Sequence, residues 1–169
     1  MPSFRTFIAL GSNQGSRLTH LREAALAIAD HFEILGSAWV YRTEAMYRSQ
    51  PDFLNTAIEA LTTIPASDVL ETLLEIESSL GRTRTVRYGP RSIDIDLIIH
   101  GNTVLRSERA EVPHPRFAER PFVLKPLVDL APDFRDPITG QRFDSLNAAC
   151  PTWLRCDRVF APSWKDSYG

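Results

Sequence analysis

The sequence predicts an α+β fold, an antiparallel sheet covered by helices, and three observations lead to this prediction. Short apolar runs bounded by polar turns recur along the chain, which is typical of strands. Two longer stretches carry apolar residues every three or four positions, the period of an amphipathic helix. The 169 residues are enough to bury a core and contain no evident linker, so a single domain over residues 1–169 is expected.

The first half of the pattern begins with an apolar run at residues 4–10, which predicts a strand that ends at a turn over residues 11–15. A helix is expected over residues 16–32, because six apolar residues recur there at helical spacing: Leu18, Leu21, Ala25, Ile28, Ala29 and Phe32. Residues 34–43 and 53–63 predict two further strands, and the polar segment between them predicts a loop.

The second half continues with a helix over residues 66–80, for which Gly81 is a typical C-terminal stop. A polar loop separates this helix from a strand at 93–99. The resulting order, βαββαβ, is that of the split βαβ or ferredoxin-like sandwich. Beyond it, a short helix is expected over residues 122–130, limited by Pro126 near its middle.

The end of the chain carries less information. The core of the fold is expected over residues 4–132, while the tail at about 148–169 has no assignment. Residues 153–169 are expected to pack loosely or not at all. The predicted architecture is therefore a ferredoxin-like sandwich with extra C-terminal elements.

Composition excludes several classes of protein. The net charge of −2 gives no basic footprint for nucleic acid, so no nucleic-acid partner is expected. No apolar run approaches the length of a membrane span, and no membrane partner is expected. Cys150 and Cys156 are the only cysteines and lack the spacing of a zinc site. A cytoplasmic location with free thiols is therefore expected.

The most informative segment is Ile93-Asp94-Ile95-Asp96-Leu97, whose residues alternate between apolar and acidic. On a strand, Asp94 and Asp96 share one face, with Cα atoms roughly 6.5–7 Å apart. Carboxylates at this spacing can bind one divalent cation or bridge two. Four arginines precede the pair, which suggests a polyphosphate between cations and carboxylates: Arg82, Arg84, Arg87 and Arg91. The alternative is a solvated strand face with surface ion pairs of little energetic value.

Other segments suggest ligand contacts less specifically. Phe53 and Asn55 would share a strand face, where a ring and a carboxamide can bind a flat heterocycle, although a core Phe and a turn Asn are the more common explanation of these two residues alone. The turn at 11–15 can bind phosphate or simply reverse the chain, and it matches neither a Walker nor a Rossmann motif. His114 lies between two prolines on a loop that also carries Arg116 and Arg120.

Together these segments resemble the 6-hydroxymethyl-7,8-dihydropterin pyrophosphokinases of folate biosynthesis. The resemblance covers about residues 6–132, and its most specific element is Gly89-Pro90-Arg91-x-x-Asp94-x-Asp96. Five further blocks occur in the same order: Ile8–Asn13, Gln50–Asn55, Gly81-Arg82, Val112–Arg116 and Arg120–Leu127.

The resemblance implies a reaction in which ATP donates its β,γ-diphosphate to the pterin hydroxymethyl group and AMP leaves. Asp94 and Asp96 match the carboxylates that hold two Mg2+ ions along the triphosphate. Arg82 and Arg91 match the arginines that neutralise the phosphates in the reaction, and are the expected catalytic residues. A monomer is the default for the family.

The remaining site residues are also implied by the resemblance. Contacts with ATP are expected from Arg82, Arg91 and four further residues: Glu77, Arg109, His114 and Arg120. Contacts with the pterin are expected from Asp94 and four others: Thr43, Phe53, Asn55 and Phe122. Asn13 is expected to support the Phe122 loop. Three alternatives stay open: a homologue that binds pterin or ATP without catalysis, a pyrophosphokinase for another pterin alcohol, and a ferredoxin-like RNA-binding module, which the charge disfavours.

Overall fold

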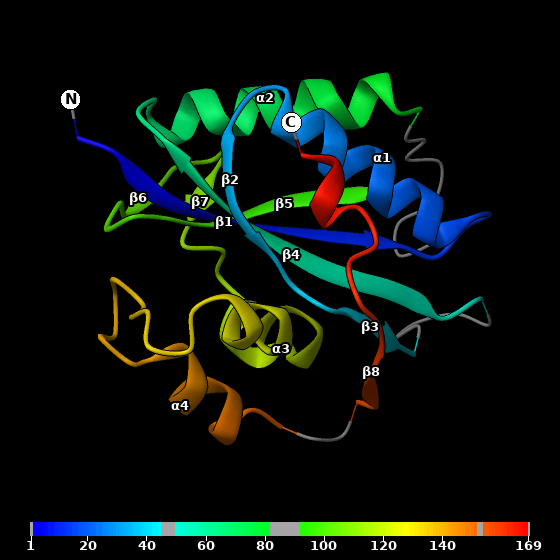
Figure 1. Cartoon of the computed structure of the whole chain (residues 1–169). Coiled ribbons are helices and arrows are strands. Elements are labelled where there is room, and N and C mark those ends of the chain that lie inside the picture. The colour runs from blue at the N-terminus through cyan, green and yellow to red at the C-terminus, as the bar shows by residue number, and fades with distance from the viewer. Residues whose placement is uncertain (1, 45–49, 82–91, 152–153, 169) are drawn as a thin grey trace.

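The computed structural model describes residues 2–44, 50–81, 92–151 and 154–168. An antiparallel sheet crosses the molecule, with one pair of helices on one face and a second pair on the other (Figure 1). The predicted α+β class is therefore confirmed. In the described ranges, no helix is both long enough and apolar enough to cross a bilayer.

The first five elements follow the predicted order, with one strand divided. They are β1 (Phe4–Ser12), α1 (Arg17–Ala29), β2 (Glu33–Ser37), β3 (Val40–Thr43) and β4 (Phe53–Thr62). The strand predicted over residues 34–43 is thus two strands, β2 and β3, which pair with different parts of β4. The residues between them leave the ladder, and the backbone N–H of Ala38 donates to the Ala57 carbonyl.

The next elements complete the predicted core. They are α2 (Ala66–Ser79) and β5 (Asp94–His100). Helix α2 ends where the sequence predicts, because Gly81 adopts a φ of 78° that favours glycine. Helices α1 and α2 bury their apolar faces on one side of the sheet, together with Ile93, Ile95 and Leu97. Asp94 and Asp96 therefore lie on the opposite face, as the alternation predicts.

The strands pair in the order β5-β1-β4-β3, with β8 (Cys156–Phe160) at the edge beyond β3 and β2 also paired with β4. All of these pairings are antiparallel. Strand β1 is longer than predicted. Gly11 and Ser12 continue the strand instead of opening a turn, because β4 pairs with both residues and β5 pairs with Gly11.

The opposite face of the sheet is covered by α3 (Pro121–Leu130) and α4 (Phe143–Ala149). Pro126 does not limit α3, which continues to Leu130. The pyrrolidine ring removes one N–H, but Pro126 itself is buried in the apolar face of the helix. A small hairpin, β6 (Leu105–Arg106) and β7 (Glu111–Val112), lies beyond the end of β5.

The C-terminal tail does not pack loosely, and this prediction is wrong for residues 154–168. Strand β8 pairs with β3 along its length, and the chain then returns over the α1 side of the sheet (Figure 1). Trp164 is fully buried there in the α1–α2 core, and the Tyr168 hydroxyl lies 2.7 Å from Ser37 Oγ. The prediction of loose packing failed because the segment is polar and proline-containing, whereas its order comes from tertiary contacts.

Candidate active site

The centre of the site is a row of residues that runs across three strands. Gly11 of β1 is paired with Asp94 of β5 on one side and with Asn55 of β4 on the other. Paired residues on neighbouring antiparallel strands project from the same face. The register therefore brings Asp94 and Asn55, which are 39 residues apart in sequence, to either side of a glycine on the α3 face.

Gly11 is required by space and not by backbone conformation. A Cβ atom at this position would lie 2.8 Å from Asn55 Oδ1, closer than real contacts of this kind. The absence of a side chain lets the Asn55 carboxamide extend over β1 toward Asp94. Gly11 therefore provides the gap between the acidic strand and the amide.

Asn55 is held on its other side by Thr43. Asn55 Nδ2 donates to Thr43 Oγ1 at 2.9 Å, and both residues are buried. The Thr43 hydroxyl in turn donates to Cys156 Sγ at 3.7 Å. The structure thus brings together two of the residues predicted to contact the pterin, and the bond to Thr43 orients the Asn55 carboxamide.

Asp94 and Asp96 present carboxylates on the same face as Asn55. Asp94 is half-buried and Asp96 is exposed, so both are open to a ligand from solvent. Within the described residues, no group of three or more His, Cys, Asp or Glu side chains that could hold a metal ion is found. Paired carboxylates fit magnesium, which keeps several waters and is typically bound through one or two carboxylates plus substrate phosphates.

Glu77 lies behind the acidic strand. Its side chain is buried, and Glu77 Oε2 accepts a hydrogen bond from the Ile95 backbone N–H at 2.6 Å. This contact ties α2 to β5 at the residue between the two aspartates. Glu77, predicted to contact ATP, is therefore placed where it fixes the position of Asp94 and Asp96.

The segment that leads into β4 is held by the connection between β1 and α1. Asn13, which is fully buried, donates from Nδ2 to Gln50 Oε1 at 2.6 Å and to the Pro51 carbonyl at 3.3 Å. Arg17 Nη1 donates to the Asp52 carbonyl at 2.6 Å. These contacts of Asn13 support the approach to Phe53, whereas the sequence predicts support for the Phe122 loop.

The two predicted aromatic residues lie on the same side of the sheet. Phe53 begins β4, half-buried, on the face that carries Asn55. Phe122 is half-buried in the first turn of α3, which packs on that face. Arg120 lies with its guanidinium 5.8 Å from the centroid of the Phe122 ring, a cation–π distance.

His114 lies beside β5, close to the acidic pair. Its backbone N–H donates to the Ile98 carbonyl at 2.8 Å, two residues beyond Asp96. Burial, assisted by the charges of Arg120 and Arg116, lowers the pKa of His114 from 6.5 to about 4. The ring is therefore neutral at pH 7. Its Nδ1 accepts the Arg116 N–H at 3.2 Å, so the proton is on Nε2 and can be donated to a ligand.

Other predicted residues are less closely integrated or lie outside the described ranges. Arg109 is exposed in the turn of the β6–β7 hairpin. Arg82 and Arg91, with Arg84 and Arg87, fall in the segment 82–91, which the described residues do not include. Their predicted roles stay predictions.

Three residues that shape the site were missed by the sequence reasoning. The composition of residues 11–15 predicts a turn that includes Gly11, although an apolar run with a glycine at its end can also continue as a strand. Arg17 gave no signal beyond its charge. Cys156 lies in the tail that was expected to be loose, and no local pattern indicates a contact with a residue 113 positions earlier.

Comparison with known protein families shows to which family the chain belongs. Residues 7–132 match the family described as 7,8-dihydro-6-hydroxymethylpterin-pyrophosphokinase. The chain belongs to this pyrophosphokinase family. The match includes Asp94, Asp96, Asn55 and Gly11, and it ends before β8, so the strand that contacts Thr43 lies outside the matched range.

Individual relatives of the pyrophosphokinase family agree. The chain is 38% identical over 141 residues to the 2-amino-4-hydroxy-6-hydroxymethyldihydropteridine pyrophosphokinase of Bacillus subtilis, covering 82% of this chain and 84% of that protein. It is 39% identical over 154 residues to the protein of the same name from Pseudomonas aeruginosa, covering 87% and 92%.

A likeness in fold extends to a more distant structure. The crystal structure of wild-type Plasmodium falciparum HPPK-DHPS superimposes with a TM-score of 0.70 at 12% identity. The superposition covers 88% of this chain and 45% of that chain, so this chain spans less than half of the Plasmodium protein. At this identity the likeness supports the fold alone.

Proposed function

We propose that this family member catalyses transfer of the β,γ-diphosphate of ATP to the hydroxymethyl group of 6-hydroxymethyl-7,8-dihydropterin, releasing AMP, in folate biosynthesis. Family membership and the named relatives support the pyrophosphokinase activity. The observation that carries the proposal within the fold is the row Asp94–Gly11–Asn55, which sets a carboxylate beside an ordered carboxamide.

The two ends of this row suit the two substrates. Asn55 offers donors and an acceptor to the polar edge of a pterin, and Phe53 and Phe122 offer rings to its faces. Asp94 and Asp96 suit the magnesium-bound triphosphate, and Asp94 is proposed to contact the pterin as well. The hydroxymethyl group would then point from the amide end toward the carboxylate end, as in-line attack requires.

The residues of the chain would act chiefly by positioning and by charge. The hydroxymethyl oxygen attacks the β-phosphorus of ATP and releases its proton, and the bond between that phosphorus and the α,β-bridging oxygen breaks, so that AMP leaves with the bridging oxygen. Two magnesium ions at Asp94 and Asp96 would neutralise charge on the triphosphate. Arg82 and Arg91 are proposed to compensate charge that develops on the phosphates, since phosphoryl transfer depends mainly on such stabilisation.

We assign the remaining ATP contacts by the same reasoning. His114 is neutral and carries its proton on Nε2, so it can donate to a ribose or phosphate oxygen without adding charge. Arg120 and Arg109 offer bidentate donors to phosphate. Glu77, whose buried carboxylate accepts the Ile95 N–H, is proposed to contribute to the ATP site beside β5.

We further propose a ferredoxin-like core and action as a cytoplasmic monomer. The sheet order β5-β1-β4 with β2 and β3 on the far side, and antiparallel pairing throughout, support the ferredoxin-like assignment. The monomer rests on the family resemblance, and sedimentation of the purified chain measures it directly.

The test of the proposed function is a nucleotide product analysis. The chain is incubated with ATP, magnesium and 6-hydroxymethyl-7,8-dihydropterin, and the products are separated. AMP that forms in step with a pterin diphosphate supports the proposal. ADP would contradict it by showing γ-phosphoryl transfer. If only a different pterin alcohol is converted, that alcohol is the acceptor and the proposed one is wrong. If both substrates bind without turnover, the chain is a non-catalytic homologue.

A further inference from the structure

Strand β8 is a part of the pterin side of the site that the family match does not include. It pairs with β3 from Val40 to Thr43, and Cys156 stands directly opposite Thr43 in the register. The family match ends at residue 132. Residues 156–160 therefore form the edge of the sheet next to the strand that holds the Asn55 carboxamide.

A directed chain of hydrogen bonds links Cys156 to the carboxamide. Thr43 Oγ1 donates to Cys156 Sγ at 3.7 Å and accepts from Asn55 Nδ2 at 2.9 Å. The three residues are buried, with exposed fractions of 7% for Asn55, 2% for Thr43 and 5% for Cys156. A hydroxyl has one proton. Because that proton is given to sulfur, the oxygen is left as an acceptor and the amino end of Asn55 must face it.

This polarity decides which atoms Asn55 can offer to a ligand. With Nδ2 turned toward Thr43, the carbonyl Oδ1 lies over Gly11, where a Cβ would meet it at 2.8 Å. Without an acceptor at position 156, the Thr43 proton is free to turn to Asn55, and the carboxamide can then flip. The flipped carboxamide would then present its donor and its acceptor to the pterin in exchanged positions.

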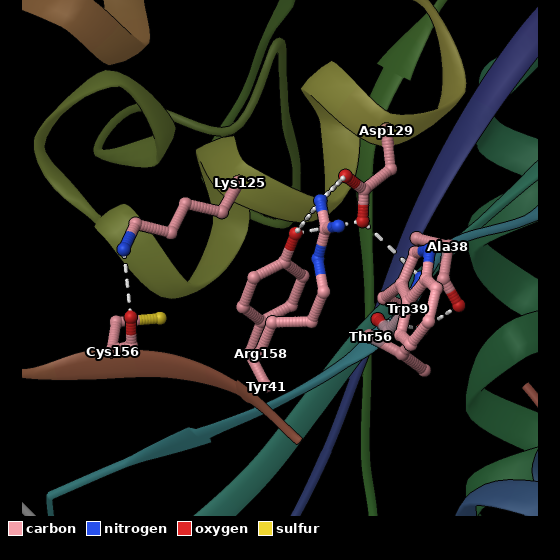
Figure 2. Close-up of polar contacts among 8 residues, drawn as sticks. All are labelled: Ala38, Trp39, Tyr41, Thr56, Lys125, Asp129, Cys156 and Arg158. Atoms are coloured by element: carbon pink, nitrogen blue, oxygen red, sulfur yellow. Dashed lines mark hydrogen bonds and ion pairs between the residues drawn. The ribbon is translucent and has the colours of Figure 1, made fainter. Parts of the chain in front are cut away.

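Strand β8 is fixed by two contacts with α3, the helix that carries Phe122. Lys125 Nζ donates to the Cys156 carbonyl at 2.7 Å. Arg158 Nη2 lies 3.0 Å from Asp129 Oδ1, and its guanidinium lies 4.9 Å from the Trp39 ring centroid. Figure 2 shows both contacts, with Lys125 and Asp129 reaching from one helix to the same strand. They join α3, the helix of the expected aromatic contact, to β8, the strand that pairs with the strand of Thr43.

We propose that Cys156 is a positioning residue for pterin recognition, acting through Thr43 to set the orientation of the Asn55 carboxamide. The inference rests on the proposed function, since it assumes that Asn55 contacts the pterin. It assigns β8 a role in specificity in addition to its role in the sheet. It predicts that loss of the hydrogen-bond acceptor at position 156 weakens pterin binding and leaves ATP binding unchanged.

The test compares Cys156→Ala with Cys150→Ala, the other buried cysteine, which packs in the α3–α4 core. Calorimetric affinities and KM values for the pterin and for magnesium-ATP are measured, together with thermal unfolding. We expect Cys156→Ala to weaken pterin binding about three- to tenfold, the effect of one hydrogen bond, with ATP affinity unchanged. Cys156→Ser, which restores an acceptor, is expected to recover at least part of the loss.

A second variant keeps the test decisive if Cys156→Ala folds poorly. Thr43→Val breaks the same chain of hydrogen bonds at its middle residue. Its effect on pterin affinity should not add to that of Cys156→Ala, because both variants interrupt the link between Cys156 and Asn55. If the wild type is active and Cys156→Ala and Cys150→Ala bind the pterin equally well, the proposed function stands and the inference is overturned. Additive losses, or equal losses for pterin and ATP, would also overturn it. A wild-type chain that neither binds nor converts the pterin would overturn the proposed function with it.

Discussion

Replacing Gly11 with alanine tests the central row of the site directly. The new Cβ would lie 2.8 Å from Asn55 Oδ1, and ordinary contact begins at 3.4 Å, so the oxygen must move by about 3.4 − 2.8 = 0.6 Å. A straight retreat is blocked, because Asn55 Nδ2 is already 2.9 Å from Thr43 Oγ1. The carboxamide must therefore rotate away and lose that bond.

The effects on stability and on ligand affinity should separate. Loss of one buried hydrogen bond costs about 0.5–1.5 kcal/mol of folding free energy. Replacement of glycine by alanine returns about 0.4–1 kcal/mol by restricting the unfolded chain. The free energy of unfolding should therefore change by about 1 kcal/mol or less. Pterin binding depends on the orientation of the amide, so we expect an affinity about five- to thirtyfold weaker, equivalent to roughly 1–2 kcal/mol.

The assay is calorimetric titration with the pterin and separately with magnesium-ATP, and denaturant unfolding measures stability. Gly36→Ala is the matched control, because its Cβ would meet only Leu130 Cδ2, at 3.3 Å, in another part of the sheet. The control should leave pterin affinity unchanged. If Gly11→Ala folds normally and binds the pterin as tightly as the wild type, the reasoning about the Asp94–Gly11–Asn55 row is refuted.

Three further predictions follow from single residues. Lowering the pH from 6.5 to about 4 should destabilise the protein, because the pKa of His114 is lower in the folded chain than in the unfolded chain. Denaturant unfolding at pH 7 and pH 5 measures this loss of folding free energy. His114→Gln should make the loss smaller by roughly 1–2 kcal/mol, after discounting for solvent screening. Asp94→Asn should abolish the magnesium dependence of ATP binding, and a retained magnesium effect in calorimetry would count against the predicted metal site. Trp164→Ala should cost about 3–5 kcal/mol, since the ring is fully buried; a melting temperature within 2 °C of the wild type would contradict the packing of the tail.

Much of the fold could be predicted because its determinants are local. The alternation from Ile93 to Leu97 specified a strand and correctly assigned the two carboxylates to the face away from α1 and α2. Gly81 marked the end of α2 through its positive φ. Boundaries were less accurate where pairing decides them, as at Gly11 and Ser12, which continue β1 because neighbouring strands pair with them.

The sequence proposes a set of residues for the candidate site, but it does not give their arrangement. The aspartates, Asn55 and Phe53 were identified by residue type and by resemblance to a family. That Asn13 supports the segment before Phe53 was not predicted, because its hydrogen bonds reach Gln50 and Pro51 across a loop. Sequence reasoning likewise gave His114 no protonation state, which depends on burial and on the charges of Arg120 and Arg116.

The sequence by itself determined the order of elements, the acidic face of β5 and the family, because periodicity and motif spacing are properties of neighbouring residues. Only the tertiary structure decided that Gly11 separates Asp94 from Asn55, and that Cys156 stands opposite Thr43. Both depend on the register between strands that are distant along the chain, and that register is set by pairing and burial in the folded sheet. The tail shows the same limit: its local pattern predicts little order, and its contacts with β3, α3 and the core create that order.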